Sequence, residues 1–132
     1  MVFKLLAVDD DAASAELVVR ISERCGFEAF ATSDPRGFLE LCKQLTPSVV
    51  AIDINMPNID ANGVLMLLHD VSFKGKILIV SGQDFDTMRR VADFGESLGL
   101  QRPEVVQKPI DVSKMRMLLG GFWKELQSKD TA

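Results

Sequence analysis

The strongest constraint on the fold is an alternation between short, continuous apolar runs and longer segments with helical hydrophobic spacing. Short apolar runs are typical of strands that are buried on both faces, and helical spacing is typical of helices that cover a sheet. Turn residues separate the two kinds of segment. The pattern therefore predicts a parallel sheet covered by helices, with a strand-helix unit repeated five times. The predicted strands are 5–8, 28–31, 49–54, 77–80 and 105–106.

The helical segments lie between these runs. Segment 13–25 has apolar residues along one face and ends before Gly26, a residue type that commonly terminates helices. The other predicted helices are 35–45, one beginning near 63 or 64, 84–98, and one that follows Asp111. A length of 132 residues with 47% hydrophobic residues suits one well-buried core. We expect a single domain over residues 1–126 and a frayed polar tail over 127–132.

Composition argues against several classes of function. The net charge is −4 and the basic residues are scattered, so we expect no direct binding of nucleic acid. No apolar stretch is long enough to cross a bilayer, and the first apolar run does not resemble a secretory signal. Cys25 and Cys42 lack metal-ligand spacing and are predicted to be reduced thiols on helix faces. These features favour a cytoplasmic protein without a membrane partner.

The residues that finish the predicted strands carry the candidate chemistry, because ligands of open parallel sheets bind outside the carboxyl ends of the strands. Four strand ends lead into polar residues: Asp9 and Asp10, Asp53, Ser81-Gly82, and Lys108-Pro109. Right-handed crossovers bring these ends to one edge, so three carboxylates, a hydroxyl and an ammonium group should share a cleft. Clustered carboxylates are the usual ligands of Mg²⁺, and a carboxylate beside a cation and a lysine can accept a phosphoryl group.

These residues stand in four short motifs: V-D-D at 8–10, D-I-N-M-P at 53–57, V-S-G at 80–82 and K-P at 108–109. In this order, and along nearly the whole chain, the motifs resemble the receiver domain of response regulators, the CheY-like domain of two-component signalling. The resemblance implies a three-layer, doubly wound (βα)5 flavodoxin-like fold. Its five-stranded parallel sheet would have the strand order 2-1-3-4-5.

The resemblance also implies a role for each matched residue. Asp53 becomes the phosphoacceptor, Ser81 hydrogen-bonds the arriving phosphoryl group, and Lys108 pairs with that group. The implied cofactor is Mg²⁺. Its implied ligands are Asp10 and Asp53 through their carboxylates, Asn55 through its backbone carbonyl, and Asp9 through water.

Four further expectations come from the same resemblance. Gly82 would leave space open beside the phosphoryl group. Pro109 would follow a cis peptide bond, which costs little before proline. Asn55 and Gln83 match two variable positions that influence how long the phosphate survives in this family.

The resemblance further implies the partners. The phosphate donor would be the phosphohistidine of a sensor histidine kinase or a phosphotransfer protein. The signal would pass to a downstream partner or a fused output domain that these residues do not identify. We expect a monomer or weak dimer, and no enzymatic activity beyond self-phosphorylation and self-dephosphorylation at Asp53.

Three departures from the family pattern stand out. Val105 occupies a position where many receivers have an aromatic residue, and the chain has no Tyr. Gly63 lies later after Met-Pro than in most receivers, which predicts a longer loop. Between Ser81 and Lys108 there are 26 residues, several more than usual, with the surplus around 96–103. This segment loosely resembles receivers joined to cyclic-di-GMP phosphodiesterase domains, and it predicts an unusual output face.

Two alternatives remain from the residues alone. An aspartyl-phosphate phosphatase also uses a strand-end Asp with Mg²⁺, but it characteristically needs a second Asp two positions later, where this chain has Asn55. A non-phosphorylated interaction module with the receiver fold is the other alternative, because the aromatic switch residue is missing at Val105. The complete set of acidic residues and Lys108 favours a phosphorylated receiver over both.

Overall fold

The computed structural model describes residues 2–56 and 61–131. Within these residues, strands and helices alternate along the chain, which confirms the predicted element order. The strands are β1 (Lys4–Val8), β2 (Glu28–Thr32), β3 (Val49–Ile52), β4 (Lys76–Ser81) and β5 (Glu104–Gln107). The helices are α1 (Ala12–Arg24), α2 (Phe38–Leu45), α3 (Ala61–Asp70), α4 (Phe85–Ser97) and α5 (Val112–Thr131).

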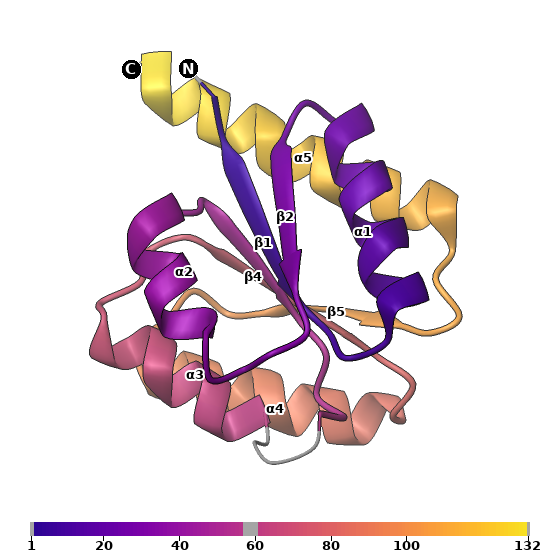
Figure 1. Cartoon of the computed structure of the whole chain (residues 1–132), viewed down its shortest axis with the longest axis vertical. Coiled ribbons are helices and arrows are strands. Elements are labelled where there is room, and N and C mark those ends of the chain that lie inside the picture. The colour runs from indigo at the N-terminus through magenta and orange to yellow at the C-terminus, as the bar shows by residue number, and fades with distance from the viewer. Residues whose placement is uncertain (1, 57–60, 132) are drawn as a thin grey trace.

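The strands form one parallel sheet in the order β2-β1-β3-β4-β5, as predicted. The sheet is twisted, and helices cover both of its faces (Figure 1). Side chains of α1 and α5 pack on one face of the sheet. Side chains of α2, α3 and α4 pack on the other face, and α4 lies over β4 there. The three-layer, doubly wound architecture is therefore confirmed.

Alternation along the strands divides the core between the two faces. Neighbouring strand residues point to opposite sides of a sheet. In β1, Leu5 and Ala7 join the cluster under α1 and α5, whereas Leu6 and Val8 join the cluster under α2 and α3. All four residues of β3 are buried, which explains why the central strands read as continuous apolar runs.

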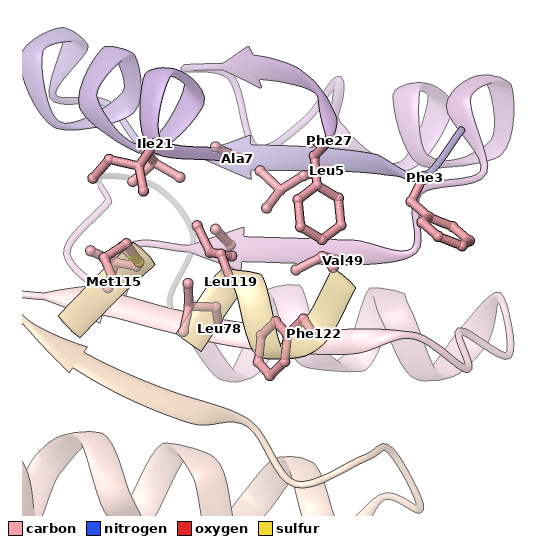
Figure 2. Close-up of a cluster of buried hydrophobic side chains, with 13 residues drawn as sticks. Phe3, Leu5, Ala7, Ile21, Phe27, Val49, Leu78, Met115, Leu119 and Phe122 are labelled. Carbon is pink, nitrogen blue, oxygen red and sulfur yellow. The ribbon is translucent and has the colours of Figure 1, made fainter. Parts of the chain in front are cut away.

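The core cluster under α1 and α5 also holds the last helix, α5, against the sheet. Figure 2 shows Met115, Leu119 and Phe122 pointing from α5 towards the sheet, and all three are buried. Next to them, Trp123 packs edge-on against Phe3, with ring centroids 6.2 Å apart. A Cβ atom on Gly26 would come within 2.8 Å of the Trp123 indole nitrogen, so the turn after α1 needs glycine to admit the indole.

Helix boundaries differ from the prediction in three places. Helix α2 begins at Phe38 because residues 34–37 form a turn, in which the Asp34 carboxylate accepts a hydrogen bond from the Arg36 amide. Helix α3 begins at Ala61, before Gly63. Helix α5 continues to Thr131, so residues 127–131, which we expected to be a frayed tail, are helical.

The additional residues between α4 and β5 do not lengthen α4, and some of them pack in the core. Helix α4 ends at Ser97 and has 13 residues, the same length as α1. In the following segment, Leu100 and Pro103 are buried, and Pro103 lies against Gly95 of α4. The segment is therefore a packed loop along α4, so the prediction of an unusual surface there stays open.

Cys25 and Cys42 are free thiols, as predicted, and they belong to cores on opposite faces of the sheet. Among the described residues, no helix is both long enough and apolar enough to cross a membrane.

Candidate functional site

Backbone hydrogen bonds hold the site residues at the carboxyl edge of the sheet. The Asp53 amide donates to Val8 O at 2.9 Å, and the Lys108 amide donates to Ser81 O at 2.7 Å. These bonds continue the strand pairing beyond β3 and β5. The sheet therefore fixes the backbone of Asp53 and Lys108 at its carboxyl edge, where the sequence placed them.

Three carboxylates meet at this edge. One oxygen from each of Asp9, Asp10 and Asp53 lies within 4.8 Å of the others. Asp9 and Asp53 are only 4% and 5% exposed, whereas Asp10 is exposed. Burying like charges this close is unfavourable unless a cation compensates them.

Lys108 supplies part of that compensation. Its Nζ lies 3.1 Å from Asp9 Oδ2 and 3.3 Å from Asp53 Oδ2, so a single ammonium group bridges two carboxylates. Burial by itself lowers the pKa of Lys108, but the hydrogen bond to Asp9 and the charges of Asp53 and Asp9 outweigh burial and raise it overall. The bridging group therefore stays protonated at neutral pH.

The pKa of Asp9 shows that burial in this cluster disfavours its ionised form. Burial raises its pKa from 3.8 to about 6, although the hydrogen bonds from the Asp11 amide and Lys108 act in the opposite direction. Asp53 adds to the rise because it is a neighbouring acid. A second cation in the cluster would favour the ionised form of Asp9.

The donor set suits a hard divalent cation. Mg²⁺ prefers oxygen ligands and usually keeps several waters, so it needs only a few carboxylates on one open side. Asp10 is exposed next to the two buried acids, which gives the cluster a side that faces solvent. Asp9, Asp10 and Asp53 can thus hold such a cation.

The remaining predicted residues surround the cluster. Ser81 is fully buried at the end of β4, and its Oγ accepts a hydrogen bond from the Gln83 amide at 3.3 Å. A Cβ atom on Gly82 would have no atom within 4 Å, so the space beside it is open. The Lys108-Pro109 peptide bond is cis, which confirms that expectation.

Asn55 lies at the rim of the site. Its backbone amide donates to Asp53 Oδ1 at 2.9 Å, and its side chain is exposed. Residues 57–60 of the loop, which include Pro57 and Asp60, lie outside the described residues, so the expected lengthening of that loop stays a prediction.

Sequence reasoning missed one group of contacts. The Gln83 side chain donates to Asn55 Oδ1 at 2.6 Å, and Gln107 donates to the Gln83 carbonyl at 3.1 Å. Glutamine at the end of a strand carries no distinctive sequence signal. The resemblance had singled out Asn55 and Gln83 but not the contact between them, and for Gln107 the available pointer was its position immediately before Lys108.

The fold and this site define a class of protein: a doubly wound α/β domain with an acidic cluster and a lysine at the carboxyl edge of its sheet. The model of the response regulator receiver domain family matches residues 5–119. The chain belongs to this family. Neither alternative considered from the sequence is favoured by this match.

Curated relatives show the same relationship. Response regulator MprA of Mycolicibacterium vanbaalenii is 30% identical over 90% of this chain and 51% of its own length. Protein-glutamate methylesterase/protein-glutamine glutaminase 5 of Myxococcus xanthus is 29% identical over 89% of this chain and 34% of its own length. The chain thus spans about half or less of these relatives.

Solved structures agree on the fold. Chemotaxis response regulator CheY4 of Vibrio cholerae has a TM-score of 0.77 at 19% identity, covering 92% of this chain and 99% of its own. The receiver domain of an HD domain-containing protein from Pseudomonas fluorescens has a TM-score of 0.80 at 16% identity, with coverages of 97% and 99%. At these identities the likeness shows the fold alone. The loose resemblance to receivers of cyclic-di-GMP phosphodiesterases stays a prediction.

Proposed function

We propose that Asp53 accepts a phosphoryl group from a phosphohistidine and that the chain uses the added charge as a signal. The observation that carries the proposal is the buried Asp53 carboxylate, with Lys108 Nζ at 3.3 Å and the acids Asp9 and Asp10 beside it. This arrangement combines a nucleophile with charges that can neutralise an incoming phosphoryl group.

In the proposed reaction an Asp53 oxygen attacks phosphorus. The new O–P bond forms as the N–P bond to the donor imidazole breaks, and the released imidazole takes up a proton from water. Lys108 pairs with the negative oxygens of the transferring group, and Ser81 donates a hydrogen bond to one of them. Mg²⁺ held by Asp9, Asp10, Asp53 and the Asn55 carbonyl would supply further charge neutralisation when bound.

The proposed partners follow from this chemistry. The donor is a sensor histidine kinase or a phosphotransfer protein, and the receiver of the signal is a downstream protein or a fused output domain. Because the curated relatives are longer than this chain, the output domain is a proposal for the whole protein. We further propose a cytoplasmic receiver over residues 1–126, monomeric or weakly dimeric, that does not itself contact nucleic acid. Its chemistry would be limited to gain and loss of phosphate at Asp53.

Intact-mass spectrometry with acetyl phosphate tests the proposal. Native protein should gain one phosphoryl group when Mg²⁺ is present and none when Mg²⁺ is chelated. Asp53→Ala should gain none. Asp70→Asn, which alters an exposed acid at the end of α3, is the matched control and should behave as the native protein does.

Two results would overturn the proposal. Uptake by Asp53→Ala at the native level would place the phosphate on another residue. If the folded native protein gained no phosphate, the non-phosphorylated interaction module would become the better account.

A further inference from the structure

Gln83 joins three neighbouring strand ends. Its side-chain amide donates to Asn55 Oδ1, after β3, at 2.6 Å. Its backbone carbonyl accepts from Nε2 of Gln107, the last residue of β5, at 3.1 Å. We call Asn55, Gln83 and Gln107 the amide strap.

One end of the strap reaches the proposed phosphoacceptor. The Asn55 amide donates to Asp53 Oδ1 at 2.9 Å, and the Gln83 amide donates to Ser81 Oγ at 3.3 Å. A phosphoryl group on Asp53 would add about two negative charges and new acceptor oxygens at this point. Hydrogen bonds that end on Asp53 and Ser81 must adjust to that change.

The other end of the strap reaches the outer edge of the sheet. Gln107 lines a hollow of about 420 Å³ between the start of α4, β5 and α5, together with Phe85, Val105 and Leu118. Phe85 is 55% exposed at its rim. The strap therefore connects the phosphorylation site with this hollow through three residues.

The strap is also suited to change. The side chains of Asn55 and Gln107 are exposed and that of Gln83 is half-buried, so water can replace any broken hydrogen bond. By contrast, Val105 has only methyl groups to offer and cannot take part in a polar relay. Among the side chains of β5, Gln107 makes a direct hydrogen bond to the loop after β4.

We infer that Gln107 is a positioning residue that holds Gln83 against Asn55 and so transmits the state of Asp53 to the hollow beside β5. The inference rests on the proposed phosphorylation of Asp53. It assigns the transmitting role to the side chains of Gln83 and Gln107, in a chain whose Val105 stands where many receivers have an aromatic residue.

Methyl NMR spectra of Val105, Val106 and Leu118, recorded with and without beryllofluoride and Mg²⁺, provide the test. Gln107→Met keeps the length of the side chain but removes the N–H donor. Gln107→Lys restores a donor of similar reach. Gln101→Met is the matched control, because Gln101 also donates to a backbone carbonyl, that of Lys74 at 2.7 Å, away from the acidic cluster.

We expect Gln107→Met to take up phosphate from acetyl phosphate as the native protein does. Its methyl shift changes should fall to roughly half or less, because the hydrogen bond that couples Gln83 to β5 is lost. Gln107→Lys and Gln101→Met should give near-native shift changes, and the thermal midpoints of all variants should agree.

Native-sized shift changes in Gln107→Met would overturn the inference, as would equal losses in Gln107→Met and Gln101→Met. Failure of the native protein to take up phosphate is a separate result that overturns the proposed function. The two failures are distinguished by the mass measurement, which precedes the NMR comparison.

Discussion

Two clusters of ion pairs in this protein look alike in composition and differ in burial. At the carboxyl edge of the sheet, Lys108 bridges Asp9 and Asp53, and the side chains of both acids are 5% exposed. On the outer face of α4, Arg102 bridges Asp93 and Glu96, whose side chains are 65% and 59% exposed.

The difference in burial determines what each cluster contributes to stability and to function. Water screens the exposed cluster, so its pairs contribute little to folding. The buried cluster holds two acids and one cation away from water, and its desolvation cost is only partly offset by attraction. An arrangement that is poor for stability is retained where an incoming cation or phosphoryl group can use it.

Lys108→Ala is the change with the largest expected effect. Without the ammonium group, two buried carboxylates lose their partner, and we expect the free energy of unfolding to fall by about 3 kcal/mol. Urea denaturation in EDTA measures this loss. Mg²⁺ should restore more stability to the variant than it adds to the native protein, because the acids remain available as ligands. An unchanged unfolding midpoint, or a variant that no longer binds Mg²⁺, would contradict this account of Lys108.

Asp9→Asn should instead raise the free energy of unfolding. The folded-state pKa of Asp9, about 6, lies above its ordinary value of 3.8, so the ionised form destabilises the fold at neutral pH. The penalty is fully present above pH 6, falls as the pH is lowered through 6, and is absent below the unfolded-state value. The variant should therefore be more stable than the native protein by up to about 3 kcal/mol at pH 7.

The measurement is urea denaturation of both proteins from pH 4 to pH 7.5 without metal. The difference in stability should shrink as the pH falls and should disappear near pH 4. A difference that is independent of pH would show that the ionisation of Asp9 is not its source.

Arg102→Ala should have the smallest effect on stability, and it tests the exposed cluster of ion pairs. The hydrogen bond from Arg102 to Asp93 raises the pKa of the guanidinium, yet both groups are in contact with water. We expect a slight loss of thermal stability at low salt and none at high salt, measured by thermal denaturation. A large loss at high salt would mean that Arg102 holds the loop after α4 by packing.

The strand ends were predictable because burial and chemistry change abruptly there. Central strands such as β3 read as apolar runs, and an acid at the end of such a run lies at the edge of the sheet, although the predicted strand 49–54 extended two residues beyond Ile52, where β3 ends. Topology then determines which ends meet. Asp9, Asp53 and Lys108 were found this way although they are far apart in sequence.

The features that the sequence did not predict depend on which groups a side chain contacts in the folded protein. The start of α2 was misplaced because the turn that delays it is closed by the Asp34 carboxylate, which in sequence looks like a helix cap. The contact between Gln83 and Asn55 depends on the spacing of two loops, and no periodicity reports that spacing. Helix α5 continues through polar residues because its apolar side chains anchor the helix before that point.

The packing of Trp123 against Phe3 has a spectroscopic consequence. The chain has one Trp and no Tyr, so its intrinsic emission comes from a single indole where the last helix meets the first strand. Loss of that contact should shift the emission when the protein unfolds. Because Trp123 does not line the acidic cluster, ion binding there should leave the emission nearly unchanged, and titrations at Asp53 will need a different probe.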